Sequence, residues 1–452
     1  MSNNRESLPV IVGLGSTGIS CARYFLARGD RFKVVDSRQS PPELAALRAI
    51  APNVEVELGK FSVRTLTNAA QLVVSPGVTL KTPAIQTAIK AGVPVTGDID
   101  IFSKAVTQPI VAVTGSNGKS TVVAILAEIL RASGKAYGLG GNLDGSNFKP
   151  ALDLLQEDEK DFYVLELSSF QLETTENLGA EVAVLLNLSE DHMDLYTDIG
   201  EYHRAKQRIF NGCRQVVVNR NDPYSAPSSQ IDAQVWEFGY SRPAAQGLGL
   251  LEEDGDQYIA YQFEKIVSVN DLKIFGRHNV TNALAAATIA MALDIELAAI
   301  KSGLQTFSGL PHRCQWVADI NSVSFYNDSK GTNVGATCAA IQGLGEHISG
   351  HIILIAGGVG KGADFSSLNP VVNRWGKEVI LIGQDALQVS AILDKDIATY
   401  FAADLSDAVN VALQHAMPGD AVLLSPACAS FDQFDNFQHR GQVFIQAVEA
   451  LQ

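Results

Sequence analysis

The sequence predicts an α/β protein of three domains. At 452 residues the chain is too long for one ordinary hydrophobic core, and about two to four domains are expected. Short apolar runs typical of buried strands alternate with helical stretches in three successive regions. Glycine-rich or polar strings follow these strands, which is where open α/β sheets bind ligands.

The first region has a glycine-rich turn between a strand at 10–12 and a helix that should end near residue 28. The turn reads Gly13-Leu14-Gly15-Ser16-Thr17-Gly18, and a second strand at 32–35 ends in Asp36. This spacing is typical of a Rossmann-like dinucleotide site and leaves a nicotinamide-dependent oxidoreductase open. A glycine turn at a helix N-terminus accepts any diphosphate, however, including that of UDP. A further strand at 72–75 precedes Gly77.

The second region starts near residue 98 and contains a phosphate-loop pattern. A strand at 110–113 runs into Thr114-Gly115-Ser116-Asn117-Gly118-Lys119-Ser120-Thr121, and a helix follows over 122–131. The glycines let backbone N–H groups approach phosphate, Lys119 adds a positive charge, and the Ser120 hydroxyl can ligate Mg²⁺. Val113 stands where the standard pattern has its first glycine. An ordinary strand-to-helix turn and a simple P-loop NTPase or kinase therefore stay open.

Three further polar residues of this region are candidates for a site. Glu166 lies near the end of a buried strand that starts at residue 162, where a charge needs a partner or a metal. His192 follows the strand at 182–188 within an acidic string, which favours metal binding over a core histidine. Asn279 opens an alanine-rich helix and can cap it or bind adenine or phosphate. Lys206, on a helix over 201–210, has only the pattern of a solvated basic face. Residues 220–270 are expected to be more irregular.

The third region begins near Gly309 and again alternates strands, at 352–356, 379–382 and 421–424, with helices. Polar strings lie at 327–333, 357–364 and 425–434. Each alone is compatible with a capped turn. Three such strings in one small domain predict a ligand site.

Composition limits the partners and the compartment. The net charge of −15 argues against nucleic acid as a binding partner. The sequence contains no run of 18 apolar residues, so no membrane span is predicted. The polar segment Met1–Pro9 lacks a signal-peptide pattern, so a cytoplasmic protein is expected. The five cysteines are scattered without a Cys-x-x-Cys pair, which indicates reduced thiols rather than disulfides or zinc.

With these motifs, essentially the whole chain resembles the Mur ligases, the ATP-dependent family that builds the peptidoglycan stem peptide. The shared signals are the string from Thr114 to Thr121, the Glu166 strand, Asp191-His192-Met193-Asp194, Gly276-Arg277-His278-Asn279 and Pro311-His312-Arg313. The short phosphate loop is the family's own form. Three strings, 165–173, 327–330 and 425–437 with Arg440-Gly441, resemble the D-glutamate-adding branch. Asp435-Asn436-Phe437-Gln438 replaces the Asp-Asn-Pro-Arg motif of the diamino-acid-adding members, which fits a smaller acceptor.

The resemblance implies an N-terminal Rossmann-like domain (1–97), a central P-loop ATPase-like domain (98–309) and a C-terminal Rossmann-like domain (310–452). It implies that the first domain and part of the second bind the UDP substrate through Gly15, Ser16, Thr17, Asp36, Arg38, Gly77, Asn142 and His192. ATP would contact Gly115, Ser116, Asn117, Gly118, Lys119, Ser120, Thr121, Asn279, Arg313 and Asp328. D-glutamate would contact Lys330, Thr332, Lys361, Ser430, Phe431 and Phe437.

The resemblance also implies the chemistry. Lys119, Glu166, His192 and Lys206 would be catalytic, and Mg²⁺ would be held by Ser120, Glu166, His192 and Lys206 carrying a carbamate. The expected reaction joins D-glutamate to UDP-N-acetylmuramoyl-L-alanine through an acyl phosphate made with ATP. We expect a monomer without membrane partners, in which the domains close about hinges near 97–100 and 308–312. A folate-type ligase is the competing reading among relatives, and the turn at 13–18 argues against it.

Overall fold

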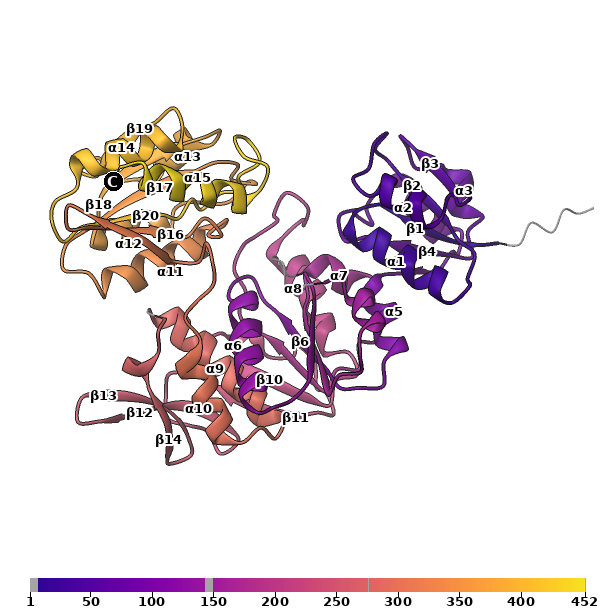
Figure 1. Cartoon of the computed structure of the whole chain (residues 1–452), viewed down its shortest axis with the longest axis horizontal. Coiled ribbons are helices and arrows are strands. Elements are labelled where there is room, and N and C mark those ends of the chain that lie inside the picture. The colour runs from indigo at the N-terminus through magenta and orange to yellow at the C-terminus, as the bar shows by residue number, and fades with distance from the viewer. Residues whose placement is uncertain (1–6, 143–148, 275, 452) are drawn as a thin grey trace, which may run out of the picture.

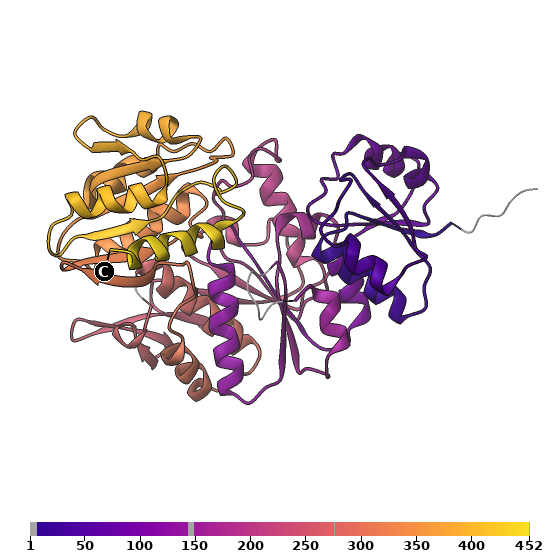
Figure 2. The ribbon, with the colours of Figure 1, turned by 45° about the horizontal axis from the view of Figure 1, so that its top comes forward.

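The structure is a computed structural model that describes residues 7–142, 149–274 and 276–451. It contains a five-stranded, a nine-stranded and a six-stranded sheet, each with helices packed on it. The N-terminal and C-terminal units flank the central one (Figures 1 and 2). The predicted three-domain α/β class is confirmed. The segment Met1–Pro9, whose polar composition argues against a signal peptide, is described only from residue 7 onward. Residues 1–6 lie outside the described residues.

The N-terminal unit is a parallel sheet in the order β3-β2-β1-β4-β5. Alternate residues of its strands point to opposite faces, so that Ile11 joins one apolar cluster and Val12 another. The strand order reverses between β1 and β4, and the glycine turn after β1 lies at this switch point. The elements are β1 (Pro9–Val12), α1 (Ser16–Ala27), β2 (Lys33–Asp36), α2 (Leu44–Ile50), β3 (Glu55–Leu58), α3 (Val63–Thr67), β4 (Gln71–Val74), α4 (Pro83–Lys90) and β5 (Val95–Thr96).

The central unit has the sheet order β14-β13-β12-β11-β10-β9-β6-β8-β7, with β13 and β14 antiparallel to their neighbours. Its first part comprises α5 (Asp98–Ala105), β6 (Ile110–Thr114), α6 (Lys119–Ala132), β7 (Tyr137–Gly141), η1 (Ala151–Gln156), β8 (Phe162–Glu166), α7 (Ser169–Glu173), β9 (Val182–Leu185), α8 (Ile199–Gln207) and η2 (Arg208–Phe210). Its second part comprises β10 (Gln215–Asn219), η3 (Pro223–Ser225), β11 (Gln234–Phe238), β12 (Gly247–Glu253), β13 (Asp256–Tyr261), β14 (Glu264–Ser268), η4 (Val269–Asp271), α9 (Arg277–Ala292) and α10 (Leu297–Thr306). The sheet places the ends of β6, β8 and β9 side by side.

The C-terminal unit has the order β15-β16-β20-β17-β18-β19, in which only the β15–β16 pair is antiparallel. Apolar clusters cover both faces of this sheet. The elements are β15 (Gln315–Ile320), β16 (Val323–Asn327), α11 (Val334–Gly345), β17 (Ile352–Gly357), α12 (Leu368–Trp375), β18 (Gly376–Ile382), α13 (Ala386–Ile392), β19 (Ala398–Phe401), α14 (Leu405–His415), β20 (Ala421–Leu424) and α15 (Phe437–Glu449).

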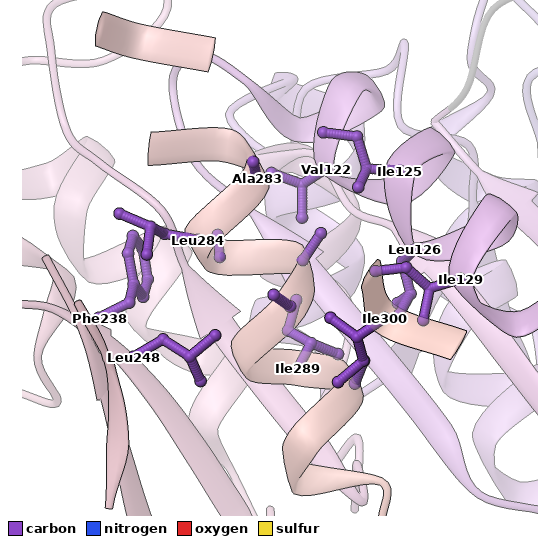
Figure 3. Close-up of a cluster of buried hydrophobic side chains, with 14 of the residues drawn as sticks. Val122, Ile125, Leu126, Ile129, Phe238, Leu248, Ala283, Leu284, Ile289 and Ile300 are labelled. Atoms are coloured by element: carbon purple, nitrogen blue, oxygen red, sulfur yellow. The ribbon is translucent and has the colours of Figure 1, made fainter. Parts of the chain in front are cut away.

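The phosphate-loop helix α6 is held by the alanine-rich helix α9. Small side chains such as Ala283 let α9 approach its neighbours closely, while Leu284 extends toward Phe238 and Leu248 of the sheet (Figure 3). Helix α6 also packs against α10, where a Cβ on Gly303 would lie 2.6 Å from the Ile129 Cα. The helix that carries Lys119 at its start is therefore fixed by packing along its length.

The N-terminal and central units share one apolar core. Phe25 of α1 belongs to the same buried cluster as Phe102 of α5 and Leu152 of η1. At the surface of this junction Asp153 accepts hydrogen bonds from Ser20 Oγ at 2.8 Å and Arg23 Nη1 at 3.1 Å. The two units are therefore joined by continuous packing as well as by the chain.

The expectation of irregular structure over residues 220–270 is wrong, because β11 to β14 lie in this stretch. Asp254 and Gly255, with φ of 54° and 87°, form the turn between β12 and β13, as an Asp-Gly pair does in tight hairpins. In the described parts of the chain, every helix is too short or too polar to cross a bilayer.

Candidate active site

The phosphate-loop pattern forms a glycine loop between β6 and α6. Gly115 and Gly118 have φ of 155° and 83°, and a Cβ on Gly118 would lie 2.4 Å from Asn282 Oδ1. Within the described part of the chain, the N-cap of α6 is Gly118, which has no side chain to cap the helix. Its N–H groups and the positive end of the helix dipole are therefore available to an anion.

Lys119 and Ser120 begin α6. They are placed for the two functions expected of this loop, a positive charge for phosphate and an oxygen ligand for Mg²⁺. Lys119 Nζ donates to the carbonyls of Gly115 at 2.9 Å and Ser116 at 3.1 Å, which places a positive charge over the loop. Ser120 Oγ donates to Glu166 Oε2 at 2.6 Å. Because β6 and β8 are adjacent parallel strands, Glu166 ends its strand directly beside the loop. A hydroxyl and a carboxylate oxygen at this position are suitable Mg²⁺ ligands.

Lys206 on α8 lies under the same loop and is buried, with 2% of its surface exposed. Its Nζ donates to the Gly115 carbonyl at 2.9 Å and lies 4.6 Å from the centre of the Tyr202 ring. Burial, and then the charge of Lys119, hold the pKa of Lys206 well below its ordinary value. The solvated face that its sequence pattern suggests is therefore wrong for Lys206.

Asp191 and His192 follow β9 at the edge of the same site. Asp191 accepts a hydrogen bond from Lys361 of the C-terminal unit at 3.3 Å. Burial alone would raise the pKa of Asp191, but the charges of His192, Lys361 and Lys119 lower it. His192 packs edge-on against Phe170 at 5.2 Å, and burial lowers its pKa.

The C-terminal unit reaches the phosphate loop directly. Arg313 Nη2 donates to Ser120 Oγ at 2.7 Å, and Asn333 Nδ2 donates to Asn117 Oδ1 at 3.0 Å. Behind Arg313, the buried Asp328 accepts hydrogen bonds from Ser425 Oγ and the Cys314 N–H. Burial raises the pKa of Asp328 to about 6.

These residues surround one cavity of about 880 Å³ between the central and C-terminal units. The predicted site residues on its wall are Ser116, Asn117, Gly118, Lys119, Ser120, Thr121, Asn142, Glu166, His192, Asn279, Arg313, Asp328, Lys330, Thr332, Lys361, Ser430, Phe431 and Phe437. Gly115 and Lys206 lie behind this wall and contact it. In the described residues no three His, Cys, Asp or Glu side chains form a metal-binding cluster.

The six predicted residues of the N-terminal unit are not on that wall. Gly15 is the N-cap of α1, and Ser16 and Thr17 begin the helix. Asp36 ends β2, Arg38 follows that strand and Gly77 follows β4, all at the switch-point end of the first sheet. Arg38 pairs with the buried Asp36 carboxylate through Nη2 at 2.7 Å and Nε at 2.9 Å. Burial would raise the pKa of Asp36, but Arg38 and the Leu14 N–H hold it at about 2. This second cluster suits one end of a long ligand.

Comparison with known proteins decides the family. Family models match residues 8–97 (Mur ligase MurD-like, N-terminal domain), 113–290 (Mur ligase middle domain) and 312–428 (Mur ligase, glutamate ligase domain). The chain belongs to the Mur ligase family.

Among curated Mur ligases, the UDP-N-acetylmuramoylalanine--D-glutamate ligase of Pseudomonas aeruginosa is 50% identical over 442 residues, covering 98% of both chains. That of Hahella chejuensis is 48% identical over 447 residues, covering 99% of both. Solved Mur ligases share the fold. MurF of Thermotoga maritima in complex with ADP has a TM-score of 0.63 at 16% identity, covering 100% of this chain and 97% of that chain. MurC of the same organism has a TM-score of 0.60 at 17% identity, covering 98% and 100%.

Two asparagines of this Mur ligase site were not among the predicted residues. Asn187 accepts the Asn117 N–H at 2.9 Å and donates to the Asn117 carbonyl at 3.0 Å, which fixes the phosphate loop. Asn333 caps α11 through the Ala336 N–H and also bonds to Asn117. Both lie in polar strings that follow strands, which is the sequence pattern that indicates a ligand site. Their common partner depends on contacts between distant segments and is not readable from the sequence.

Proposed function

We propose that this Mur ligase joins D-glutamate to UDP-N-acetylmuramoyl-L-alanine with ATP as the energy source. The named activity of relatives at about half identity over nearly the full length supports this. One structural observation carries it: the phosphate loop and the polar loops of the C-terminal unit face one cavity, and Arg313 spans them at Ser120. A nucleotide and an amino-acid acceptor can therefore meet there.

The reaction has two steps. The L-alanine carboxylate attacks the γ-phosphorus of ATP, which gives an acyl phosphate and ADP. The D-glutamate amine then attacks the acyl carbon, the bond to the phosphate oxygen breaks, and an amide, inorganic phosphate and a proton are released. Lys119 neutralises charge on the transferring group, and the loop N–H groups orient it, which are the main demands of phosphoryl transfer.

Ser120 and Glu166 are suited to hold Mg²⁺, because their oxygens lie 2.6 Å apart beside the phosphate loop. Mg²⁺ that is bound by one or two protein oxygens keeps several water or phosphate oxygens, which leaves room here for further ligands. Bound there, the ion would neutralise phosphate oxygens. We place His192 and a carbamylated Lys206 in the same metal environment. Lys206 is buried beside the loop, and among the described residues its amine has no carboxylate hydrogen-bond partner, as expected of an amine that takes up a negative group.

The nucleotide end of the substrate is assigned to the switch point of the first sheet. Its diphosphate would meet the N-terminus of α1 at Gly15, Ser16 and Thr17, near Gly77, with Asp36 and Arg38 beside it. The muramoyl end would reach Asn142 and His192 at the main cavity. Domains 1–97, 98–309 and 310–452 would thus bind the UDP substrate, ATP, and D-glutamate with part of ATP. We place the enzyme, as a monomer, in the cytoplasm, where nucleotide-linked precursors are made.

In the ATP site, Asn279 lies at the start of α9 for adenine or phosphate, and Arg313 and Asp328 approach from the C-terminal unit. The acceptor site combines Lys330, Thr332, Lys361, Ser430, Phe431 and Phe437 on one side of the cavity. Two lysines there match the two carboxylates of glutamate. Phe431 is 73% exposed, so its contact with a ligand would require an ordered loop.

The test is phosphate release from ATP and Mg²⁺ with UDP-N-acetylmuramoyl-L-alanine, across a panel of amino acids that includes both glutamate enantiomers. We expect release with D-glutamate and none with L-glutamate. Release with another amino acid would keep the ligase and change its acceptor. Release without any acceptor would contradict the proposal and favour a simple NTPase.

A further inference from the structure

Arg440 on α15 is the largest of the fully buried side chains, with 1% of its surface exposed. It does not line the cavity. Burial lowers its pKa to about 10, so the guanidinium stays charged at neutral pH. A buried charge destabilises a fold unless hydrogen bonds or an opposite charge compensate it.

Two loops supply the hydrogen-bond acceptors of Arg440, and the nearby Asp432 and Asp328 side chains also favour its charge. Arg440 donates from Nε to Ser329 Oγ at 3.0 Å and from Nη2 to the Ser329 carbonyl at 2.8 Å. It donates from Nη1 to the Cys428 carbonyl at 3.1 Å. Within the described ranges Arg440 forms no ion pair. Three of its nitrogens are thus used to join residue 329 to residue 428.

The two joined loops carry the proposed acceptor residues. The Lys330 loop (residues 329–332) contributes Lys330 and Thr332 to the cavity, and the Ser430 loop (residues 427–431) contributes Ser430 and Phe431. Ser329 Oγ also donates to the Phe437 carbonyl at 2.8 Å, and Lys330 Nζ lies 3.9 Å from the centre of the Phe437 ring. Arg440 therefore lies directly behind the groups that would touch the amino acid.

The hydrogen bonds of Arg440 affect both the stability and the geometry of the two loops. Without the guanidinium the Ser329 and Cys428 carbonyls would lose a donor, which costs stability. The same directional bonds fix the spacing of the two loops, which an apolar residue cannot do. Misplacement by about 1 Å can reduce a rate about 100-fold. The benefit of the guanidinium is therefore expected in acceptor binding.

We propose that Arg440 is a positioning residue for the amino-acid acceptor, holding the Lys330 loop and the Ser430 loop at the separation that D-glutamate requires. This inference rests on the proposed function. Its site of action is confined to the acceptor side, because the three hydrogen bonds reach no residue of the phosphate loop or of the N-terminal unit.

The test compares Arg440→Met and Arg440→Lys with Phe444→Leu, a buried apolar change on the same helix. For Arg440→Met we expect the KM for D-glutamate to rise roughly 10- to 100-fold, with the KM values for ATP and the UDP substrate within about 3-fold of wild type. Arg440→Lys, which keeps the charge but not the fork, should be intermediate. Phe444→Leu should lower the melting temperature and leave the KM for D-glutamate unchanged.

Equal rises in all three KM values, or a KM for D-glutamate within about 2-fold of wild type, would overturn the inference. If Arg440→Met does not fold, Arg440→Lys decides the question by the same comparison, the KM for D-glutamate against the KM values for ATP and the UDP substrate. Wild-type enzyme separates the two proposals. If another amino acid supports phosphate release, the substrate assignment fails and the KM for that amino acid tests Arg440. If none does, both are wrong.

Discussion

Lys206 and Asp98 are buried ionisable side chains, and neither forms an ion pair in the parts of the chain that the structure describes. They differ in what surrounds them. Lys206 faces the phosphate loop through the Gly115 carbonyl. Asp98 starts α5 at the junction with the N-terminal unit, and its Oδ1 has no hydrogen-bond partner among the described residues. We therefore predict a chemical modification at Lys206, and an effect of Asp98 on the pH dependence of stability.

Lys206→Ala should lower the ligase rate about 100-fold or more, because the negative group proposed to form on this amine is lost. A short-chain carboxylic acid fits the space left by the side chain and should restore part of the rate. Phosphate release measured against acid concentration checks this. Lys119→Ala is the matched control and should not respond to the acid. A folded Lys206→Ala protein that no acid rescues would speak against the carbamate.

Asp98→Asn should stabilise the protein at pH 8. Burial raises the pKa of Asp98 from 3.8 to about 6, although the Ile99 N–H and Gln171 lower it in part. The folded state therefore holds a proton more tightly than the unfolded state. The contribution of Asp98 to stability is complete below pH 3.8 and is lost as the pH rises through about 6.

At pH 8 this loss amounts to about 3 kcal/mol, and the asparagine variant should recover much of it. Urea unfolding at pH 8 and pH 4 measures the difference between variant and wild type. The advantage should shrink at pH 4. An advantage of equal size at both values would show that the effect is not the titration of Asp98.

At this scale, the sequence identified chemical types but not partners. Glu166 and Ser120 were predicted from strand ends and the loop pattern, and their contact follows from the pairing of β6 with β8. The burial of Lys206 could not be predicted from the residue pattern, because it depends on how α8 packs under the phosphate loop. The sequence places Arg440 only within a motif, because its two partners lie 111 and 12 residues away.

Helices and strands were predictable where apolar periodicity was strong. The strand, loop and helix from β6 to α6 lie where the pattern indicates, with α6 beginning at Lys119. The hairpin of β12 and β13 is not evident from the sequence, because Gly247 and Gly249 interrupt the apolar alternation and acidic residues fill the turn. Those glycines are required by contact: a Cβ on Gly247 would lie 1.9 Å from the Glu237 carbonyl oxygen.

Gly303→Val should destabilise the central unit, although valine is the better helix former. Gly303 lies in α10 where that helix meets α6, and a Cβ there would be 2.6 Å from Ile129 Cα, so backbone must move. Overpacking of this kind costs about 1–3 kcal/mol. Thermal unfolding compares it with Ser302→Ala, an exposed neighbour on the same helix. A melting temperature at or above that of wild type would contradict the close packing of α10 on α6.

Across the whole molecule, the two predicted hinges are not equivalent. The N-terminal and central units share a continuous apolar core, so we expect no swing near residues 97–100. The C-terminal unit meets the central one through polar contacts, such as Lys361 with Asp191, and through the His278 ring packed on α11. Polar interfaces of this kind open more readily than apolar ones. Movement is therefore expected near residues 308–312 alone.

The contact of His278 with α11 should make this docking weaker in acid. Burial lowers the pKa of His278 from 6.5 to about 4, while its hydrogen bond to the Ala339 carbonyl partly opposes the shift. Among the described residues, no charged side chain contributes to this shift of the His278 pKa. Above pH 6.5 the ring is neutral whether docked or free. As the pH falls toward 4, the undocked state gains a proton that the docked state excludes, so docking loses stability.

Small-angle scattering with a non-hydrolysable ATP analogue and the UDP substrate measures this change. The radius of gyration of the wild type should be larger at pH 5.5 than at pH 8. His278→Gln retains an amide that can bond Ala339 but does not titrate, so its radius should be the same at both values. If His278→Gln showed the wild-type dependence, the acid sensitivity would belong to another group. If the wild type showed none, the C-terminal unit would not be held by this contact.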